Sequence, residues 1–258
     1  FSDYRDLLGR VDCASLVVPT PLHAAIARDL LANGIDVLVE KPFAATVEEG
    51  RELVALADAH GRILQVGHLE RFNPAIRSLV GVLTRPRFIE CHRLASFVER
   101  GTEVDVILDL MIHDLDVILS VVGGAVERVE AVGVPVLTEQ IDIANARLRF
   151  SDGCIANITA SRVATKRERK IRFFQTDTYV SVDYDAKYVR VYRRRRSESG
   201  APEIEASEQQ FPQGDALRAE IEDFVDAVRT RRQPVVDGRA ALRALEVAHV
   251  IKAALETV

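Results

Sequence analysis

Cysteine, methionine and tryptophan are scarce in this sequence. It contains no tryptophan and one methionine, and its three cysteines (Cys13, Cys91 and Cys154) are scattered without a C-x-x-C spacing. An odd number of isolated cysteines argues against a disulfide framework or a cysteine-ligated structural zinc. The pattern instead predicts reduced thiols in a cytoplasmic protein.

A basic excess and long apolar runs are also lacking. The net charge is -5 and the isoelectric point is near 5.8, which argues against nucleic acid as a partner. No apolar run approaches the roughly 20 residues of a membrane span, so no membrane association is expected. Four consecutive arginines begin at Arg193, and residues 193–200 are predicted to form a solvated, mobile hairpin tip. The remaining composition, 48% hydrophobic over 258 residues, suits one large or two ordinary globular domains.

The first part of the chain alternates between strand and helix patterns. Residues 14–18, 35–39 and 63–67 read as strands, and residues 23–33 and 47–60 read as helices between them. This order predicts a parallel sheet with right-handed crossovers. The glycine-rich G-x-G-x-x-G loop of dinucleotide-binding sheets is absent, and nothing before Ala14 could hold it. Either no dinucleotide binds, or the segment with the loop precedes Phe1; we expect the latter, because the chain starts in mid-fold.

The strand at residues 35–39 ends in a charge pair followed by a proline, Glu40-Lys41-Pro42. Pro42 cannot donate to a sheet ladder, so Glu40 and Lys41 are expected at the carboxyl end of the strand. In open α/β sheets, ligands bind at that edge. On position alone, Lys41 is equally well read as a surface lysine at a strand end.

The pattern changes after Pro74. A helix over residues 104–122 and a run of mostly antiparallel strands between residues 87 and 193 predict an α+β domain with an open sheet. Two further helices are expected at residues 213–231 and 238–257. We therefore expect two domains: residues 1–72, a partial Rossmann-type parallel sheet, and residues 73–258, an α+β domain for substrate binding and dimerisation. The sheet face without helices predicts a homo-oligomer, a dimer or tetramer, through this domain.

Polar groups emerge on the otherwise apolar helix at residues 104–122. Asp109 and His113 are four residues apart and therefore share a face, and Asp116 lies near it. A carboxylate beside a histidine fixes the ring's tautomer and favours its protonated form, which suits a general base. The alternative is a buried structural pair. A metal site from these three residues and His92 would lack H-E-x-x-H or cysteine ligands, so no metal is expected.

Several motifs, in this order and spacing, resemble the Gfo/Idh/MocA oxidoreductases, which are NAD(P)-dependent sugar and cyclitol dehydrogenases. They are VVPTPLH at 17–23, GIDVLVEKP at 34–42, QVGH at 65–68, RFNP at 71–74 and DLMIH at 109–113. The resemblance covers essentially the whole chain. Within the family, RFNP together with SRV at 161–163 and KIR at 170–172 is similar to members that oxidise UDP-linked N-acetylhexosamines at C3.

The resemblance implies a nicotinamide cofactor, NAD or NADP. It places cofactor contacts on Pro19, Thr20, His23, Glu40 and Lys41, although His23 is also explained as a cap of the helix that follows it. The residue that would separate NAD from NADP lies outside this sequence.

For hydride transfer from a sugar or nucleotide-sugar hydroxyl, the resemblance implies that His113 takes the hydroxyl proton. Lys41 would hydrogen-bond the reacting oxygen, with a share in the proton transfer left open, and Asp109 would orient substrate and His113. Asp116 is expected to be structural.

Four further residues are candidates for substrate contacts. Arg71, Phe72 and Asn73 follow the last strand of the first domain and would contact substrate or nicotinamide, or instead clamp the domain junction. Arg162 would bind a substrate phosphate through its planar fork, or form a surface ion pair.

Two functions of other classes remain open at this point. One is a non-catalytic binding or regulatory protein on the same scaffold, which the missing glycine loop favours. The other is an NAD-dependent lyase or glycosidase in which oxidation is transient.

Overall fold

The computed structural model describes residues 3–99, 102, 104–196, 201–212 and 214–256, and the chain divides into two compact units. The first unit comprises Phe1–Phe72 and Asp215–Glu246, and the second comprises Asn73–Gly214 and Val247–Val258. Residues 215–246 thus lie with the N-terminal unit, whereas the sequence analysis placed them in a domain of residues 73–258. No helix in the described part of the chain is long and apolar enough to cross a membrane.

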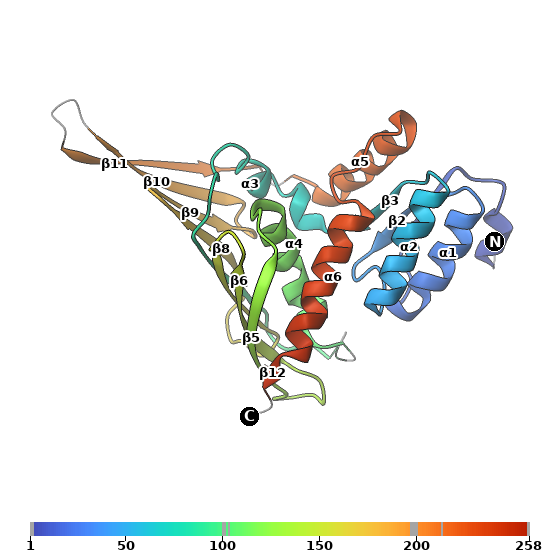
Figure 1. Cartoon of the computed structure of the whole chain (residues 1–258), viewed down its shortest axis with the longest axis horizontal. Helices are drawn as coiled ribbons and strands as arrows, with labels where there is room; N and C mark the ends of the chain where they lie inside the picture. The colour runs from blue at the N-terminus through green and yellow to red at the C-terminus, as the bar shows by residue number, and fades with distance from the viewer. Residues whose placement is uncertain (1–2, 100–101, 103, 197–200, 213, 257–258) are drawn as a thin grey trace. The chain divides into compact units, whose positions relative to one another are not determined.

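A three-stranded parallel sheet in the order β1-β2-β3 forms the centre of the first unit, as the strand and helix pattern predicted (Figure 1). Residues 37–39 of β2 are at most 4% exposed, as expected for a strand covered on both faces. The elements of this unit, up to the second-unit insertion, are η1 (Tyr4–Leu7), β1 (Cys13–Leu16), η2 (Thr20–Leu22), α1 (His23–Ala32), β2 (Asp36–Glu40), α2 (Val47–Ala59), β3 (Leu64–Gly67) and η3 (Leu69–Phe72).

Local sequence signals set the helix boundaries of this unit. Asn33 is the C-cap of helix α1, and Gly34 then takes the left-handed conformation (φ +78°) that glycine adopts without strain. Helix α2 starts with a capping box, in which the Thr46 hydroxyl accepts from the Glu49 N–H and the Glu49 carboxylate accepts from the Thr46 N–H.

The C-terminal stretch of the first unit pairs with β3 and packs against α2. Helix α5 (Ala216–Thr230) and the first part of α6 (Gly238–Ala253) belong to this stretch. Val66 of β3 donates to the carbonyl of Val236, and Gly50 of α2 leaves room for Leu242 and Leu245 of α6. These contacts explain why residues 215–246 belong to this unit.

The second unit is built on a nine-stranded sheet in the order β11-β10-β9-β8-β4-β7-β6-β5-β12. Its pairs are antiparallel except β4 with β7 and β12 with β5. Its elements are α3 (Pro74–Arg77), β4 (Phe88–Leu94), η4 (Ile107–Met111), α4 (Ile112–Val121), β5 (Val126–Val134), β6 (Ile143–Phe150), β7 (Ile155–Ser161), β8 (Glu168–Gln175), β9 (Thr178–Asp183), β10 (Tyr188–Arg196), β11 (Pro202–Gln210) and β12 (Leu255–Glu256).

The central strands of this sheet alternate between buried positions and half-buried or exposed ones. In β4, Ile89, Cys91 and Arg93 are buried, and the residues between them are half-buried. This alternation is typical of a sheet with one face on the core. The core face is covered by η4 and α4, which contact β7 and β4 (Figure 1).

Three expectations for the second unit differ from the structure. Arg193–Arg196 extend strand β10, where a loop tip was expected, because they pair with Ile204 and its neighbours of β11; residues 197–200 lie outside the described residues. The chain after α6 forms the short strand β12, whereas the helix was expected to continue to residue 257. Residue 257 also lies outside the described residues. Residues 107–111 form a π-helical turn within the expected helix.

Candidate functional site

The carboxyl ends of β1, β2 and β3 meet at one edge of the parallel sheet. Pro19 and Thr20 follow β1, Glu40 and Lys41 lie at the end of β2, and Gly67 ends β3. Pro19 is exposed, whereas Thr20, Glu40 and Lys41 are half-buried. This is the edge at which open α/β sheets bind ligands, and four of the five residues expected to contact the cofactor lie at it.

The Glu40 carboxylate lies directly against the backbone of Gly67. Glu40 is opposite Gly67 in the sheet register, and a Cβ added to Gly67 would lie 2.9 Å from Glu40 Oε2. The same oxygen accepts a hydrogen bond from the Lys41 N–H at 3.3 Å, and the Lys41–Pro42 peptide bond is cis. Only glycine at position 67 leaves the carboxylate in this place, a role that the sequence pattern did not reveal.

His23 is placed differently from the expected cofactor contact. The side chain is 1% exposed, with Nδ1 2.9 Å from the carbonyl oxygen of Pro42 and Nε2 2.7 Å from that of Val18. Both ring nitrogens therefore face the backbone of the loops that follow β1 and β2. The imidazole joins these two loops and is not presented at their surface.

The Arg71-Phe72-Asn73 stretch separates into one half-exposed residue and two buried ones. Arg71 belongs to η3 and is half-exposed, with its guanidinium 3.4 Å from the carbonyl of Val235. Phe72 is 4% exposed and belongs to the core of the first unit. The Asn73 side chain accepts from the Ala75 N–H as the cap of α3, and donates to the carbonyl of Tyr184 at 3.1 Å.

In the second unit, Asp109 and His113 lie on one continuous helical segment, η4 followed by α4. Asp109 is in the π-helical turn, His113 is in the first turn of α4, and both are half-buried. The segment begins at Asp105, whose Oδ1 accepts from the N–H groups of residues 107 and 108, and whose Oδ2 pairs with Lys252 at 2.6 Å. Single π-helical turns within α-helices are frequently found at functional sites, which makes this turn informative about Asp109.

The other aspartates of this segment are buried. Asp114 is 0% exposed and forms a two-pronged ion pair with Arg93 of β4, at 2.7 and 2.8 Å. The Arg93 guanidinium also lies 5.2 Å from the ring centre of Tyr184. Asp116 is 2% exposed. Of the four aspartates between residues 105 and 116, Asp109 is therefore the one whose side chain is not buried.

Arg162 is held inside the second unit. It is 6% exposed, its Nη2 donates to the carbonyl of Val104, and its Nε lies 3.6 Å from the Asp142 carboxylate. Hydrogen bonds from the N–H groups of residues 136–138 and from the Thr138 hydroxyl lower the pKa of Asp142 to about 2, against the opposing effect of burial. The guanidinium thus faces an ionised internal partner, which the sequence could not show.

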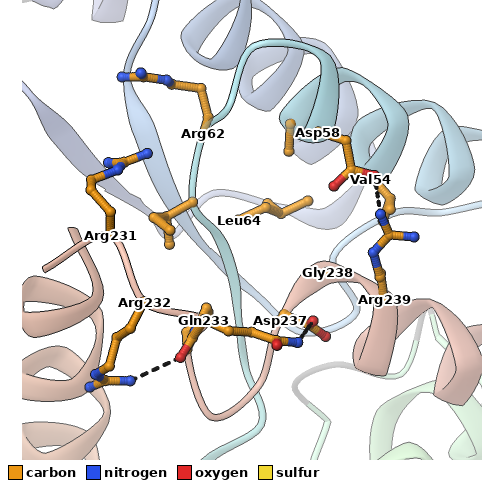
Figure 2. Close-up of a pocket in the computed structure, with 13 residues that line it drawn as sticks. Val54, Asp58, Arg62, Leu64, Arg231, Arg232, Gln233, Asp237, Gly238 and Arg239 are labelled. Carbon is orange, nitrogen blue, oxygen red and sulfur yellow. Dashed lines mark hydrogen bonds and ion pairs between the residues drawn. The ribbon is translucent and has the colours of Figure 1, made fainter.

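A pocket of about 300 Å³ in the first unit is lined by several arginines (Figure 2). Arg231 pairs with Asp36 at 2.6 Å, Arg239 pairs with Asp58 at 2.5 Å, and Arg62 donates to the carbonyl of Gly34. The pocket lies where β3 begins, at the opposite strand end from Glu40 and Lys41. Its cations are already paired with carboxylates or carbonyls, and its position differs from the ligand edge of the sheet.

No group of three or more histidine, cysteine, aspartate or glutamate side chains in the described residues is arranged to hold a metal ion. His92, which an alternative metal site would have used, projects from β4 with its Nδ1 3.6 Å from Glu168.

One ionisable residue of the first unit was not identified in the sequence analysis. Glu220 of α5 is 0% exposed, and burial, followed by repulsion from Glu40 and then Asp223, raises its pKa to about 8. The signal was present: Glu220 shares the buried face of α5 with Phe224 and Ala227, four and seven residues on.

Comparison with known proteins gives two matches to family models. Residues 1–68 match the model described as "Oxidoreductase family, NAD-binding Rossmann fold", and residues 75–181 match the "GFO/IDH/MocA C-terminal domain".

Similar proteins are found over the whole chain. It is 38% identical over 258 residues to UDP-N-acetylglucosamine 3-dehydrogenase of Acidithiobacillus ferrooxidans, covering 99% of this chain and 82% of that protein. The solved structure of that dehydrogenase has a TM-score of 0.93, with 37% identity over 99% of this chain and 82% of that chain. Inositol 2-dehydrogenase of Burkholderia multivorans is 34% identical over 132 residues, which are 48% of this chain and 39% of that protein.

Proposed function

Because the chain belongs to the GFO/IDH/MocA family of NAD-binding oxidoreductases, we propose that it oxidises C3 of a UDP-linked N-acetylhexosamine with NAD or NADP. The observation that carries this proposal is the match to the UDP-N-acetylglucosamine 3-dehydrogenase, which extends over 99% of the chain in sequence and in fold. The match to the inositol dehydrogenase covers about half of the chain, so it supports a free cyclitol less well.

The ligand edge of the first unit fits a nicotinamide nucleotide. Backbone and side chains of Pro19 and Thr20, the Glu40 carboxylate and the Lys41 ammonium lie at the strand ends, and Gly67 keeps a side chain out of the space beside Glu40. These residues would hold the cofactor, whereas His23 would act through the loops that it joins. When bound, NAD(P) supplies the hydride acceptor.

The acid-base roles are assigned to Lys41 in the first unit and to Asp109 and His113 in the second. His113 accepts the proton of the hydroxyl that is oxidised, and Asp109 orients His113 and stabilises its protonated ring. Lys41 donates a hydrogen bond to the same oxygen, which stabilises the charge that develops there. The half-exposure of all three side chains supports these roles, because a proton-transfer group must reach its substrate.

Among the expected substrate residues, Arg71 is kept as the candidate for the substrate diphosphate, because its guanidinium is half-exposed. Phe72 and Asn73 are assigned to the core of the first unit and to the cap of α3. Arg162 is assigned to bracing the loop of residues 136–142 through Asp142.

The proposal is tested by following NADH and NADPH absorbance with UDP-N-acetylglucosamine, its galactose epimer and myo-inositol as substrates, in the full-length protein. His113→Ala and Lys41→Ala should each lower kcat by about 10²-fold or more, because each removes a group that acts on the proton in the transition state. His60→Ala and Lys166→Ala are matched controls, since both side chains are exposed. Turnover of myo-inositol without turnover of UDP-sugars would refute the substrate assignment.

We also propose a homodimer or homotetramer in the cytoplasm, assembled through the half-buried face of the nine-stranded sheet. Phe88, Phe174, Tyr179 and Tyr192 form a row of ring contacts across β4, β8, β9 and β10, with centroids 5.0 to 5.9 Å apart. The three free cysteines suit a reducing compartment. Mass photometry of the parent and of Phe174→Glu tests the interface, because a charge in the row should produce monomers. Unchanged mass in the variant would contradict it.

A further inference from the structure

Glu220 lies on the same side of the sheet as the Glu40 carboxylate. Glu40 is over Gly67, and Gln65 is two residues before Gly67 in β3, so its side chain is on the same face. Gln65 Nε2 donates to the backbone carbonyl of Glu220 at 3.0 Å, which fixes this turn of α5 to that face. Repulsion from Glu40, which contributes to the raised pKa of Glu220, agrees with this placement, so the two carboxyl groups share one region behind the ligand edge.

The Glu220 carboxyl group has no partner that explains its burial. It is 0% exposed, and among the described residues neither of its oxygens has a hydrogen-bond partner. Burying an unpaired polar group costs free energy, and a carboxylate costs far more than a neutral group. A helix face that only had to pack would be better served by leucine or methionine at this position. The cost points to a role outside packing.

We propose that Glu220 is a positioning residue for Glu40, holding the carboxylate of Glu40 in place at the nicotinamide-nucleotide edge from behind. The proposal rests on the proposed function in assigning Glu40 to that edge. When Glu220 carries a proton, the pair bears a single negative charge, and no repulsion from Glu220 acts on the Glu40 carboxylate. Of two carboxyl groups that share one site, one commonly keeps its proton, because its pKa is strongly raised.

Deprotonation of Glu220 would place a second negative charge behind Glu40. Repulsion would then push Glu40 away from Gly67, and would also disfavour an anionic dinucleotide at the same edge. Other charged or titratable groups on the elements around Glu220 are Glu70 and Arg71 of η3, which packs against α5, His68 between β3 and η3, and Asp223 of α5, which is paired with Arg232.

The first test measures the coupling of the two carboxyl groups directly and does not depend on activity. In the full-length protein labelled at glutamate Cδ, the carboxyl resonance lost in Glu220→Gln identifies Glu220. Its titration is then followed by NMR in the parent and in Glu40→Gln. Glu220 should titrate at a lower pH when Glu40 is uncharged, because repulsion from Glu40 contributes to its high pKa. An unchanged titration would overturn the proposal, whatever reaction the protein catalyses.

The second test is the pH profile of NAD(P)H binding, followed by fluorescence. In the parent, the dissociation constant should rise by about tenfold between pH 7 and pH 9, since one proton is lost in this interval. Glu220→Gln should be flat over the same range, because glutamine keeps the shape and cannot ionise. Glu222→Gln is the matched control, since Glu222 is on the same helix, is exposed, and should follow the parent.

A residue with only a structural role would change the dissociation constant by the same factor at every pH. Parallel profiles for parent and Glu220→Gln would therefore overturn the proposal. If neither NADH nor NADPH binds at any pH, the proposed function fails, and the NMR titration still decides whether Glu220 acts on Glu40.

Discussion

Replacing Glu220 by glutamine should raise the free energy of unfolding by an amount that grows with pH. In the folded chain the pKa of Glu220 is raised from 4.5 to about 8, mainly by burial. Between these two pH values the folded state keeps the proton and the unfolded state has lost it. The stability of the parent is therefore highest below the unfolded pKa and falls as pH rises to the folded pKa. Glutamine has no such dependence.

The magnitude follows from the size of the shift. Each pKa unit corresponds to about 1.4 kcal/mol of differential interaction. The loss of unfolding free energy that the ionisation of Glu220 causes in the parent therefore approaches roughly 5 kcal/mol above pH 8. At pH 5.5 it is about 1 kcal/mol, and at pH 8 about 4 kcal/mol. The second value is a large share of the roughly 5–15 kcal/mol by which domains are stable. The glutamine amide is also buried without partners, which adds an offset that does not change with pH.

Urea unfolding, followed by circular dichroism at pH 5.5 and pH 8, measures the effect. The quantity of interest is the difference in unfolding free energy between Glu220→Gln and the parent, which should increase by about 3 kcal/mol from the lower to the higher pH. Glu222→Gln, with its exposed side chain, should stay within about 0.5 kcal/mol of the parent at both. A Glu220→Gln difference that is the same at both pH values would refute the assignment of a proton to Glu220.

Three further substitutions test other parts of the structure. Gly67→Ala should weaken NAD(P)H binding by about tenfold in a fluorescence titration, because the new Cβ would lie 2.9 Å from Glu40 Oε2. Gly123→Ala is the control, since open space surrounds its Cβ and binding should not change; equal weakening in both variants would contradict a role for the contact between Gly67 and Glu40. Asp142→Asn should lower the free energy of unfolding by about 2 kcal/mol in urea at pH 7. The folded pKa of Asp142, about 2, gives the parent stability above pH 4 that is lost as pH falls toward 2. A difference that does not change with pH would show that the lowered pKa is not the cause. Asp114→Asn should lower the free energy of unfolding by about 3–5 kcal/mol, because it leaves the Arg93 charge buried beside a neutral group. The double variant Arg93→Met with Asp114→Leu should regain most of this loss. A double variant as unstable as Asp114→Asn would show that the loss comes from packing and not from the unpaired charge.

Local patterns were sufficient to predict the parallel sheet and the position of Glu40 and Lys41. Three apolar residues before a charge pair and a proline define a buried strand and its end within a few residues of sequence. The helix with Asp109 and His113 was predicted for the same reason, because its apolar periodicity is local. The π-helical turn at residues 107–111 was not predicted, since it depends on a backbone ladder that side-chain periodicity does not specify.

Interactions between distant residues could not be predicted. His23 faces carbonyl groups 5 and 19 residues away, and Arg162 contacts Val104, 58 residues away. The strand β11 was missed because Ile204 is its one large apolar residue and all nine of its residues are exposed, so that the sequence carries only a weak strand signal. The assignment of residues 215–246 to the first unit likewise depends on pairing with β3 and α2 across the intervening 142 residues, Asn73–Gly214.

That discontinuity of the first unit constrains the order in which the chain can fold during synthesis. Chains emerge from the ribosome with the N-terminus first, and contacts between distant residues form slowly. When β3 emerges, the residues that will cover its outer edge and the Gly50 surface of α2 have not yet been made. The insert of residues 73–214 emerges in the interval, so the parallel sheet must wait, with an open edge, for the C-terminal stretch. Residues 215–246 therefore set the time at which the carboxyl edge of the parallel sheet acquires its final shape.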